Sequence, residues 1–387
     1  MLANFMVRNK CFLIKQVLIL ILVTLLGVGI RLYLAFYYYG NYDQNSYEIV
    51  VDIMRRGGNV YSETSRYNYS PVWSYCLFYL NELAIFTQFK FHFVLRSFLT
   101  LIDVFNALLI GLISVKIGTK LNKTVGYAVY LLNPVAILIV GLHGQFETLA
   151  MLPLLLATYL YVRRSKPLPQ MWIWLLGTLA LLIKHNTIFG VLMLFVYTAR
   201  NWRRAIIMFL LSLILFLASF AAYFPQGRSG ILQNVFMYSA KSGYGLQVLF
   251  PLWANLLIFV SFMLLLPFAA KNYFSFIQSK GMELSFVALI VSIIGIAEQY
   301  FILPIFFGSI YTSSWYWLYT LSATFFLIGS PNNINIPLFP SFWNLVWISS
   351  VGWLLSYFLT WKPPLDQPEF KNKFTSFIGS IYRSFDA

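Results

Sequence analysis

The sequence predicts an all-α fold, a polytopic membrane bundle whose first outer loop carries a helix at the membrane surface. Of the 387 residues, 60% are hydrophobic and 10% are charged, and the mean hydropathy is +0.73. Soluble globular domains do not have this composition. Long apolar runs alternate with short clusters of Lys and Arg, as the positive-inside rule predicts. We therefore expect residues 1–387 to form one multi-spanning membrane domain of about 12 or 13 spans.

The chain has 27 Lys and Arg residues and 12 Asp and Glu residues, which gives a net charge of +15. The basic residues lie between the apolar runs, so membrane topology accounts for the charge and we expect no nucleic-acid partner. The two cysteines, Cys11 and Cys76, are far apart in or beside apolar segments. This excludes a disulfide framework and a cysteine metal cluster.

The first span is predicted over about residues 12–38. Basic residues precede it, as in a signal peptide, but the apolar run is too long for one and no small-residue cleavage site follows. With the N-terminus inside, this span places residues 40–70 on the outer face. The further apolar segments run over about residues 71–88, 96–115, 124–142, 148–162, 171–199, 205–223, 248–269, 283–311, 315–329 and 342–361.

Basic clusters mark the segment ends expected on the inner face. Segment 171–199 has such a cluster at both ends, so we expect a hairpin of two short spans with its tip at Lys184–Asn186. Segment 283–311 is expected to turn outward near Glu298. If segment 71–88 were an ordinary span, the basic cluster at Lys116–Lys123 would lie outside. Either this segment re-enters without crossing, or a short further span follows it.

The polar loop over residues 40–70 is the expected active-site loop. It holds four of the twelve acidic residues, among them Asp43. Asp43 begins a predicted helix in which apolar residues recur at helical spacing, and Gly57–Gly58 ends that helix. A carboxylate on a membrane face is suited to deprotonating a hydroxyl nucleophile. The alternative is that Asp43 only caps the helix.

Two cations in a second outer loop, residues 224–247, are candidate phosphate ligands. Arg228 offers a planar fork for phosphoryl oxygens, and Lys241 offers a point charge. His143 is a third candidate. Contact with lipid headgroups explains either cation equally well, and His143 has the alternative role of a structural hydrogen-bond donor.

The expected hairpin tip places Lys184 on the same membrane face as Glu147 and Glu298. Ionisable residues near hydrocarbon cost about 2.5–3.5 kcal/mol each, so such residues tend to be functional. The convergence of charged residues from separate parts of the chain is therefore the main functional signal. A structural ion pair is the alternative for Lys184. Arg96 and Asp103, on one face of a predicted helix, are expected to be structural.

Several short motifs occur in order along the chain. Asp43–Glu48 opens the first loop and Tyr67–Pro71 closes it, and Asn133–Pro134 and His143–Glu147 follow. This order resembles the GT-C glycosyltransferases, integral membrane enzymes that use polyprenyl-phosphate sugars. The resemblance is to the branch that extends lipid-linked oligosaccharides. In that branch an acidic residue opens the first loop, a Tyr-Asp-Tyr-Pro-Pro motif closes it, and an Asn-Pro pair and a His-Phe-Gln-Tyr-Asn motif come next.

Later motifs continue the resemblance. Lys184–His185 stands at the family's Lys-Gln pair, Phe224–Arg228 at its Phe-Pro-and-Arg motif, and Ala297–Gln299 at its His-Glu-Lys motif. The likeness covers about residues 40–310. Asn68 replaces the family's Asp, Glu147 its Asn, and Ala297 its His. These departures leave the sugar and the acceptor open.

The resemblance implies inverting transfer of a hexose, glucose or mannose, from a polyprenyl- or dolichyl-phosphate sugar to a hydroxyl of a lipid-linked or cell-envelope glycan. It implies Asp43 as general base and Arg228, Lys241 and His143 as ligands of the donor phosphate. The residues expected to support these groups or to contact substrate are Glu48, Tyr69, Gln145, Glu147, Lys184, His185 and Glu298. The expected partners are the lipid-phosphate donor, the glycan acceptor and membrane lipid.

The resemblance also implies a reaction without metal or cofactor. Mg²⁺ or Mn²⁺ beside Asp43 stays open, because Glu48 or Asp52 could supply a second carboxylate. No P-loop or dinucleotide-binding motif is present, and the three histidines have no metal-ligand spacing. The expected location is a bacterial plasma membrane with the site facing outside, or the endoplasmic reticulum membrane with the site facing the lumen in a eukaryote.

Two other classes compete with this interpretation. A transporter or flippase of a lipid-linked or small polar solute would also have short broken helices and buried charges. The chain shows no repeat between its halves, however, and it has a long polar loop after the first span. A membrane acyl- or phosphotransferase would need a catalytic His or a phosphate-cradling motif, and neither spacing is present.

Overall fold

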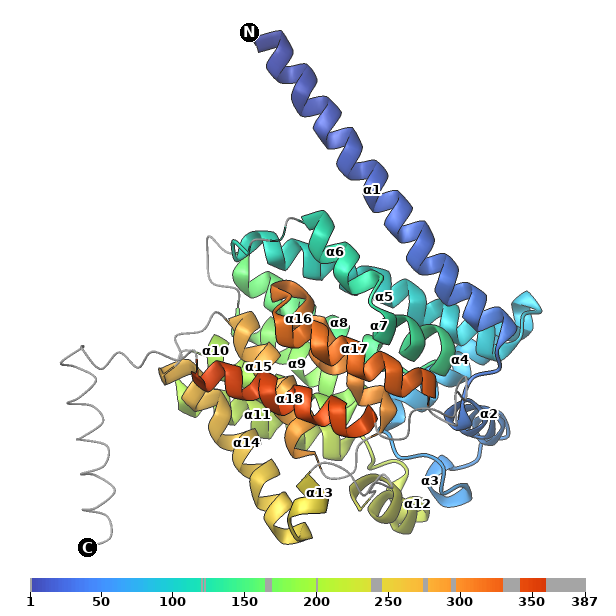
Figure 1. Ribbon diagram of the computed structural model, residues 1–387. Coiled ribbons are helices and arrows are strands. Elements are labelled where there is room, and N and C mark those ends of the chain that lie inside the picture. Colours follow the sequence, from blue (N-terminus) through green and yellow to red (C-terminus); the bar gives the residue numbers. More distant parts are fainter. Residues whose placement is uncertain are drawn as a thin grey trace, which may run out of the picture.

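The computed structural model describes residues 2–119, 121, 123–163, 169–199, 201–237, 246–273, 278–293, 297–329 and 342–359. Every regular element of these residues is a helix (Figure 1). The all-α class is thus confirmed for the described part of the chain. Residues 238–245 of the second predicted outer loop, which include Lys241, lie outside the described residues.

The helices follow one another with short connections. In chain order they are α1 (Leu2–Tyr37), α2 (Tyr42–Arg55), α3 (Val60–Glu63), α4 (Pro71–Thr87), α5 (Phe91–Lys116), α6 (Lys123–Leu131), α7 (Pro134–Ile137), η1 (Leu138–His143), α8 (Glu147–Val162), α9 (Gln170–Ile183), η2 (His185–Thr187), α10 (Ile188–Thr198), α11 (Trp202–Ala218), α12 (Phe224–Gly230), η3 (Ile231–Phe236), α13 (Leu246–Leu249), α14 (Leu252–Tyr273), α15 (Gln278–Ser292), η4 (Glu298–Ile302), α16 (Leu303–Tyr311), α17 (Ser314–Gly329) and α18 (Phe342–Leu359).

Several helices are apolar enough to cross a membrane. Among the described residues, three are also long enough, namely Ile14–Tyr37, Phe91–Lys116 and Leu252–Ala270. The pair Lys123–Leu131 and Pro134–His143, bent by 50°, would make a fourth. Further apolar helices of 10–17 residues are shorter than a simple span. These features indicate a membrane protein, and the total of 12 or 13 spans stays a prediction.

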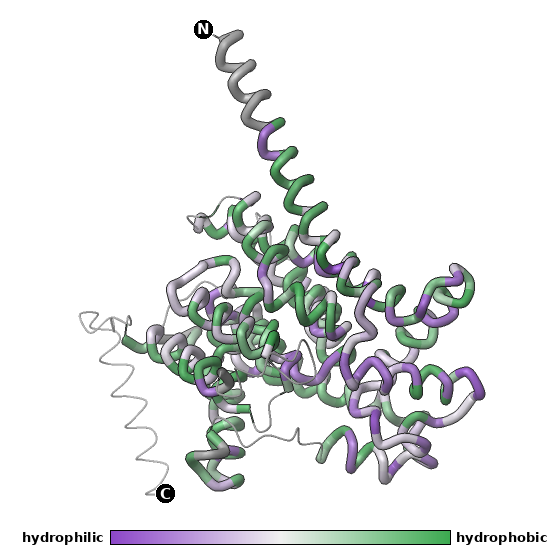
Figure 2. The backbone as a smooth tube through the Cα atoms, turned by 45° about the vertical axis from the view of Figure 1, so that its right-hand side comes forward, coloured by the Kyte–Doolittle hydropathy of each residue, from purple (hydrophilic) through white to green (hydrophobic). Residues whose placement is uncertain are grey.

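Helices α1 and α5 run antiparallel. Near the end of α1, Phe36 lies against Phe93 with ring centres 5.9 Å apart. Further back along α1, Arg31 pairs with Asp103 at 2.6 Å. Helix α1 therefore ends where α5 begins, and residues 38–90 lie at one end of the bundle, which we call the loop end. Figure 2 shows hydrophilic stretches gathered on the lower right, away from the N-terminus.

Helix α4 lies along α2 instead of carrying the chain through the bundle. Tyr47 of α2 contacts Trp73 at the start of α4, with ring centres 5.6 Å apart. Arg55 at the end of α2 pairs with Glu82 of α4 at 3.3 Å. The two helices thus run side by side in the same direction, and α5 begins at the loop end again. This geometry favours a segment 71–88 that does not cross.

The opposite end of the bundle carries basic residues. Helix α9 ends at the loop end and α8 begins there, because Lys184 pairs with Glu147 at 2.5 Å. Helix α11 runs parallel to α9, so its first turn, with Arg203 and Arg204, lies at the other end together with Arg163 after α8. We call this end the basic end. It matches the clusters predicted for the inner face.

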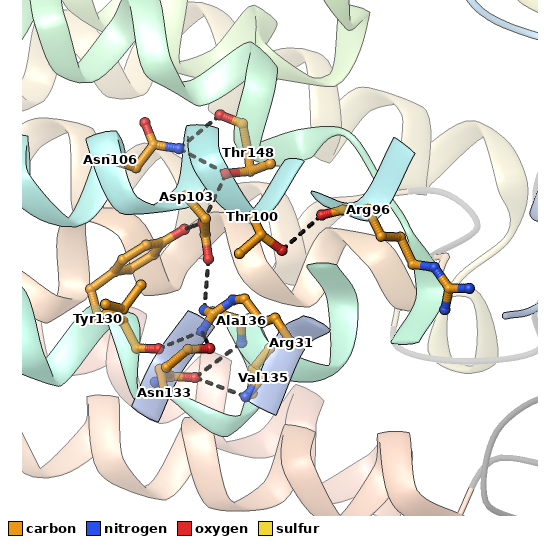
Figure 3. Close-up of polar contacts among 12 residues, drawn as sticks. Arg31, Arg96, Thr100, Asp103, Asn106, Tyr130, Asn133, Val135, Ala136 and Thr148 are labelled. Atoms are coloured by element: carbon orange, nitrogen blue, oxygen red, sulfur yellow. Dashed lines mark hydrogen bonds and ion pairs between the residues drawn. The ribbon is translucent and has the colours of Figure 1, made fainter. Parts of the chain in front are cut away.

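A buried polar network joins four helices in the middle of the bundle (Figure 3). The carboxylate of Asp103 accepts hydrogen bonds from Arg31 (2.6 Å), from Thr148 (2.8 Å) and from Tyr130. Asn106 donates to Thr148 at 2.8 Å. Because the carboxylate accepts three hydrogen bonds and an opposite charge lies beside it, its burial is compensated. The network ties α1, α5, α6 and α8 together. Asp103 is structural, as predicted, but its partner is Arg31.

Candidate active site at the loop end

The predicted base, Asp43, lies in the first turn of α2 and does not cap this helix. Asn41 is the N-cap, since its side chain accepts the Asp43 N–H at 3.1 Å. The alternative that Asp43 serves only as a cap is therefore wrong. The first turn of a helix favours a negative charge. The carboxylate of Asp43 is half-buried and available for other contacts.

Gln145 holds the carboxylate of Asp43. Its side-chain Nε2 donates to Asp43 Oδ2, and its Oε1 accepts a hydrogen bond from the Tyr47 hydroxyl at 3.1 Å. Gln145 is fully buried. It reaches this position because the π-helix η1 is followed by Gly144, where φ is +67°, a conformation that glycine adopts without strain. Among the described residues, Asp43 Oδ1 has no hydrogen-bond partner.

A buried ion pair lies beside this carboxylate. Lys184 donates to Glu147 Oε1 at 2.5 Å, and both side chains are buried. The Lys184 ammonium also lies 4.0 Å from the ring centre of Phe146 and 5.0 Å from that of Tyr69. The ring of Phe146 is in turn stacked on that of Trp73, with ring centres 3.8 Å apart. Cation–π contact lowers the cost of burying the ammonium.

One atom of this ion pair is left without a partner. Glu147 Oε2 is buried and accepts no hydrogen bond from any described residue. A buried carboxylate oxygen in that state costs free energy that a ligand hydroxyl could recover. Burial also raises the pKa of the Tyr47 and Tyr69 phenols well above the usual value. Both phenols are therefore neutral and able to donate a hydrogen bond.

His143 and Glu298 form a second polar pair at this end. The Nε2 of His143 lies 3.8 Å from Glu298 Oε2, and its Nδ1 lies 3.3 Å from the side-chain amide of Asn41. His143 is fully buried, and Glu298 is partly exposed. The same N-cap residue that orients α2 therefore touches His143. This links the first loop to the end of η1.

Arg96 fixes the backbone on both sides of the site. Its guanidinium donates to the carbonyl oxygens of Tyr38 and Tyr39, which precede α2, and to those of Gly141 (3.2 Å) and Leu142 (3.1 Å) in η1. Asp43 and Gln145 follow these two segments directly. A buried Arg that bonds carbonyls of two segments restrains both. The predicted structural role of Arg96 thus extends to the candidate site.

Of the two remaining phosphate candidates, Arg228 is not part of this cluster. Arg228 is exposed on α12, and its guanidinium lies 5.9 Å from the ring centre of Phe224. Helix α12 packs on α3, where Gly227 lies close to Tyr61. Arg228 makes no polar contact with the Asp43 cluster among the described residues. Lys241 lies outside the described residues.

Two expected supporting residues stand at the edge of the cluster. Glu48 accepts a hydrogen bond from the Tyr39 hydroxyl at 2.7 Å and does not contact Asp43. His185 follows Lys184 directly, and its ring centre lies 6.4 Å from that of Phe216. The described residues contain no group of three or more His, Cys, Asp and Glu side chains close enough to hold a metal ion.

Sequence reasoning assigned no role to three polar residues that the structure brings to this end, although it placed one of them, Asn186, at the expected hairpin tip. Asn41 directly precedes the first apolar-periodic residues, a position that marks an N-cap. The side-chain amides of Gln44 and Asn186 are buried and have no hydrogen-bond partner among the described residues. Nothing in the local sequence pattern distinguishes these two from ordinary polar residues.

The cluster thus joins a half-buried carboxylate, a buried ion pair and several unpartnered polar atoms at one end of a helical bundle. These groups suit a polar ligand with several hydroxyl groups. Comparison of the chain with protein-family models, with curated proteins and with solved structures found no match.

Proposed function

We propose that the protein is an inverting membrane glycosyltransferase that moves a hexose from a polyprenyl-phosphate sugar to a hydroxyl acceptor. The observation that carries this proposal is the state of Asp43. One carboxylate oxygen is held by Gln145, and the other has no partner among the described residues. A general base needs this combination of fixed orientation and a free oxygen.

In this mechanism the acceptor hydroxyl gives its proton to Asp43 while its oxygen attacks the anomeric carbon. The bond between that carbon and the phosphate oxygen breaks, and the polyprenyl phosphate leaves with the electron pair. A single displacement inverts the configuration at the anomeric carbon. Since the phosphate is already a good leaving group, no general acid is required. A positioned base contributes about 10²–10⁴-fold to the rate.

Cations are proposed to stabilise the charge that develops on the leaving phosphate. Arg228 is the proposed main ligand, assisted by Lys241 or His143. Lys184 and Glu147 are proposed to orient the substrate, and the unpartnered Glu147 Oε2 is suited to accept a hydrogen bond from a sugar hydroxyl. A site with little water strengthens such contacts.

The proposed orientation puts the basic end inside the cell and the loop end outside, or in the lumen of the endoplasmic reticulum. The distribution of Lys116, Arg163, Arg203 and Arg204 supports it through the positive-inside rule. Donor and acceptor would then meet at the outer leaflet. The first loop, with α2 and α4 side by side, would lie along that surface.

The test is sugar transfer from radiolabelled polyprenyl-phosphate hexoses by purified protein, with a crude extract of lipids and glycans as acceptor. Wild type is compared with Asp43→Asn and with Glu63→Gln as the control. Glu63 is a partly exposed carboxylate of the same loop that pairs with Arg56 at 2.9 Å. We expect loss of about 10²–10⁴-fold in Asp43→Asn with donor binding retained, and little change in Glu63→Gln.

Equal activity of wild type and Asp43→Asn would remove Asp43 from catalysis. Absence of transfer with every donor, together with solute uptake by the protein in liposomes, would replace the transferase by a transporter. Both experiments use the full chain from the same preparation. The size-exclusion profile and the helix content of each variant are compared with those of wild type, which reveals a folding defect.

A further inference from the structure

A groove lies at the basic end, between α9 and α11. Its volume is about 260 Å³, and it is lined by Gln170, Met171, Trp174, Arg204, Ile207 and Met208. The two polar lining residues, Gln170 and Arg204, belong to the first turns of the two helices. The other four are apolar. The groove therefore has a polar, charged mouth and an apolar body.

This groove is separate from the candidate active site. Helix α9 begins at Gln170 and ends next to Lys184, so the rise of the helix puts the two about 20 Å apart. Binding of a ligand in this groove therefore does not depend on the proposed transferase activity. It depends only on the membrane location.

Two hydrogen bonds hold the walls of the groove in place. The indole N–H of Trp174 donates to the carbonyl oxygen of Met208 at 3.1 Å, and Thr178 bonds Ser212 at 2.7 Å. Both contacts cross from α9 to α11. These hydrogen bonds fix the spacing of the two helices along the groove, so the groove is a stable feature of the folded protein.

The groove opens onto an apolar surface of the bundle. Met171 and Trp172 of α9 and Ile207, Leu210 and Ile214 of α11 are all exposed. In a membrane protein such a face is in contact with hydrocarbon. A chain that enters the groove from this side is therefore a lipid chain.

Arg204 supplies a positive charge at the mouth. Its guanidinium makes no ion pair with any described residue, and it is exposed. The neighbouring Arg203 lies over the ring of Trp202 at 5.5 Å instead. The N-terminus of α11 adds a positive partial charge at the same place. An anion in the headgroup region complements this arrangement.

We propose that this groove binds one molecule of an anionic phospholipid. Arg204 and the side-chain amide of Gln170 hold the phosphate, and one acyl chain lies along Trp174, Ile207 and Met208. The apolar opening, the fixed walls and the unpaired cation at the mouth each fit one part of such a lipid. The bound lipid would fasten α9 to α11 at the end away from the candidate active site.

The test is native mass spectrometry of the detergent-purified full chain, titrated with palmitoyl-oleoyl phosphatidylglycerol or with the phosphatidylcholine of the same chains. Arg204→Gln is compared with its matched neighbour Arg203→Gln. We expect one phosphatidylglycerol to bind the wild type more tightly than phosphatidylcholine. We expect its Kd to rise about tenfold in Arg204→Gln and less than about twofold in Arg203→Gln.

A second variant tests the body of the groove. Ile207→Trp fills it and keeps every charge, so we expect loss of the tightly bound phosphatidylglycerol; this variant decides the question if Arg204→Gln fails to fold. An equal rise of Kd in the two Arg variants, or unchanged binding in Ile207→Trp, would overturn the proposal. Displacement of the lipid by millimolar inorganic phosphate would assign the site to free phosphate and overturn it too.

Discussion

Among the described residues, two ion pairs have both side chains fully buried, and their carboxylates differ in how many hydrogen bonds they accept. In the middle of the bundle, Asp103 accepts hydrogen bonds from Arg31, Thr148 and Tyr130, so both of its oxygens are occupied. At the loop end, Glu147 accepts one hydrogen bond, from Lys184, and its second oxygen has none among the described residues.

This difference separates a structural pair from one that is available to a ligand. A buried carboxylate with all its hydrogen bonds made has no capacity left for a substrate. One with an unpartnered oxygen carries a desolvation cost that a ligand can remove. Glu147 is also close in sequence to the candidate site, because it belongs to the same motif as Gln145, whose side chain holds Asp43.

The largest effect is expected from Asp103→Ala. This change leaves Arg31 charged and buried without its carboxylate, so we expect a loss of about 3–5 kcal/mol in the free energy of unfolding. The midpoint of unfolding in detergent, followed by helix content, measures it. The double variant Arg31→Met with Asp103→Leu should recover most of the loss. If single and double variants were equally unstable, the pair would not act as a unit.

The next effect sharpens the contrast between the pairs. In the double variant Lys184→Met with Glu147→Met, neither charge remains unpaired, so we expect the free energy of unfolding to stay within about 1–2 kcal/mol of wild type. Sugar transfer should still fall about 10²-fold, because the groups facing the substrate are gone. Full activity in this variant would make the Lys184–Glu147 pair as structural as the central one.

A smaller effect is expected from Gln145→Leu. The carboxylate of Asp43 loses the donor that orients it, so kcat should fall about tenfold while KM changes little, as for a lost charge-assisted hydrogen bond. Steady-state transfer kinetics measure both constants. A rise in KM at constant kcat would show that Gln145 binds substrate and does not orient the base.

The smallest effect is expected from Tyr47→Phe. It removes the hydrogen bond to Gln145 Oε1 and keeps the packing against Trp73 and Phe146. One neutral hydrogen bond contributes about 0.5–1.5 kcal/mol, so transfer should fall no more than about tenfold. A loss as large as that of Asp43→Asn would identify the Tyr47 hydroxyl as part of the reacting site.

The predictable features of the molecule are those set by local pattern. Composition and basic clusters predict a helical membrane protein, and the spacing of apolar residues predicts a helix after Asp43. The expected convergence of Asp43, Gln145, Glu147 and Lys184 also depends on local features. Each lies at the end of an apolar run. In a bundle of antiparallel helices, every second connection along the chain lies on the same face.

The unpredictable features depend on contacts between distant segments. Arg31 lies within an apolar run, and nothing near it indicates that it pairs with Asp103 of another helix. Segment 71–88 has the composition of a short span, and only its contacts with α2 show that it stays at the loop end. Asn41 and Asp43 are both good N-caps, and packing of α2 decides between them.

The way in which Arg96 holds its neighbours has a consequence for sequence divergence. It bonds main-chain carbonyls, which every amino acid has, so Tyr38, Tyr39 and Leu142 can be exchanged without loss of those bonds. Gly141 is the exception, because a Cβ there would lie 2.9 Å from the Cα of Arg31. In proteins that descend from this chain, Arg96 and Gly141 should therefore be conserved, while Tyr38, Tyr39 and Leu142 vary.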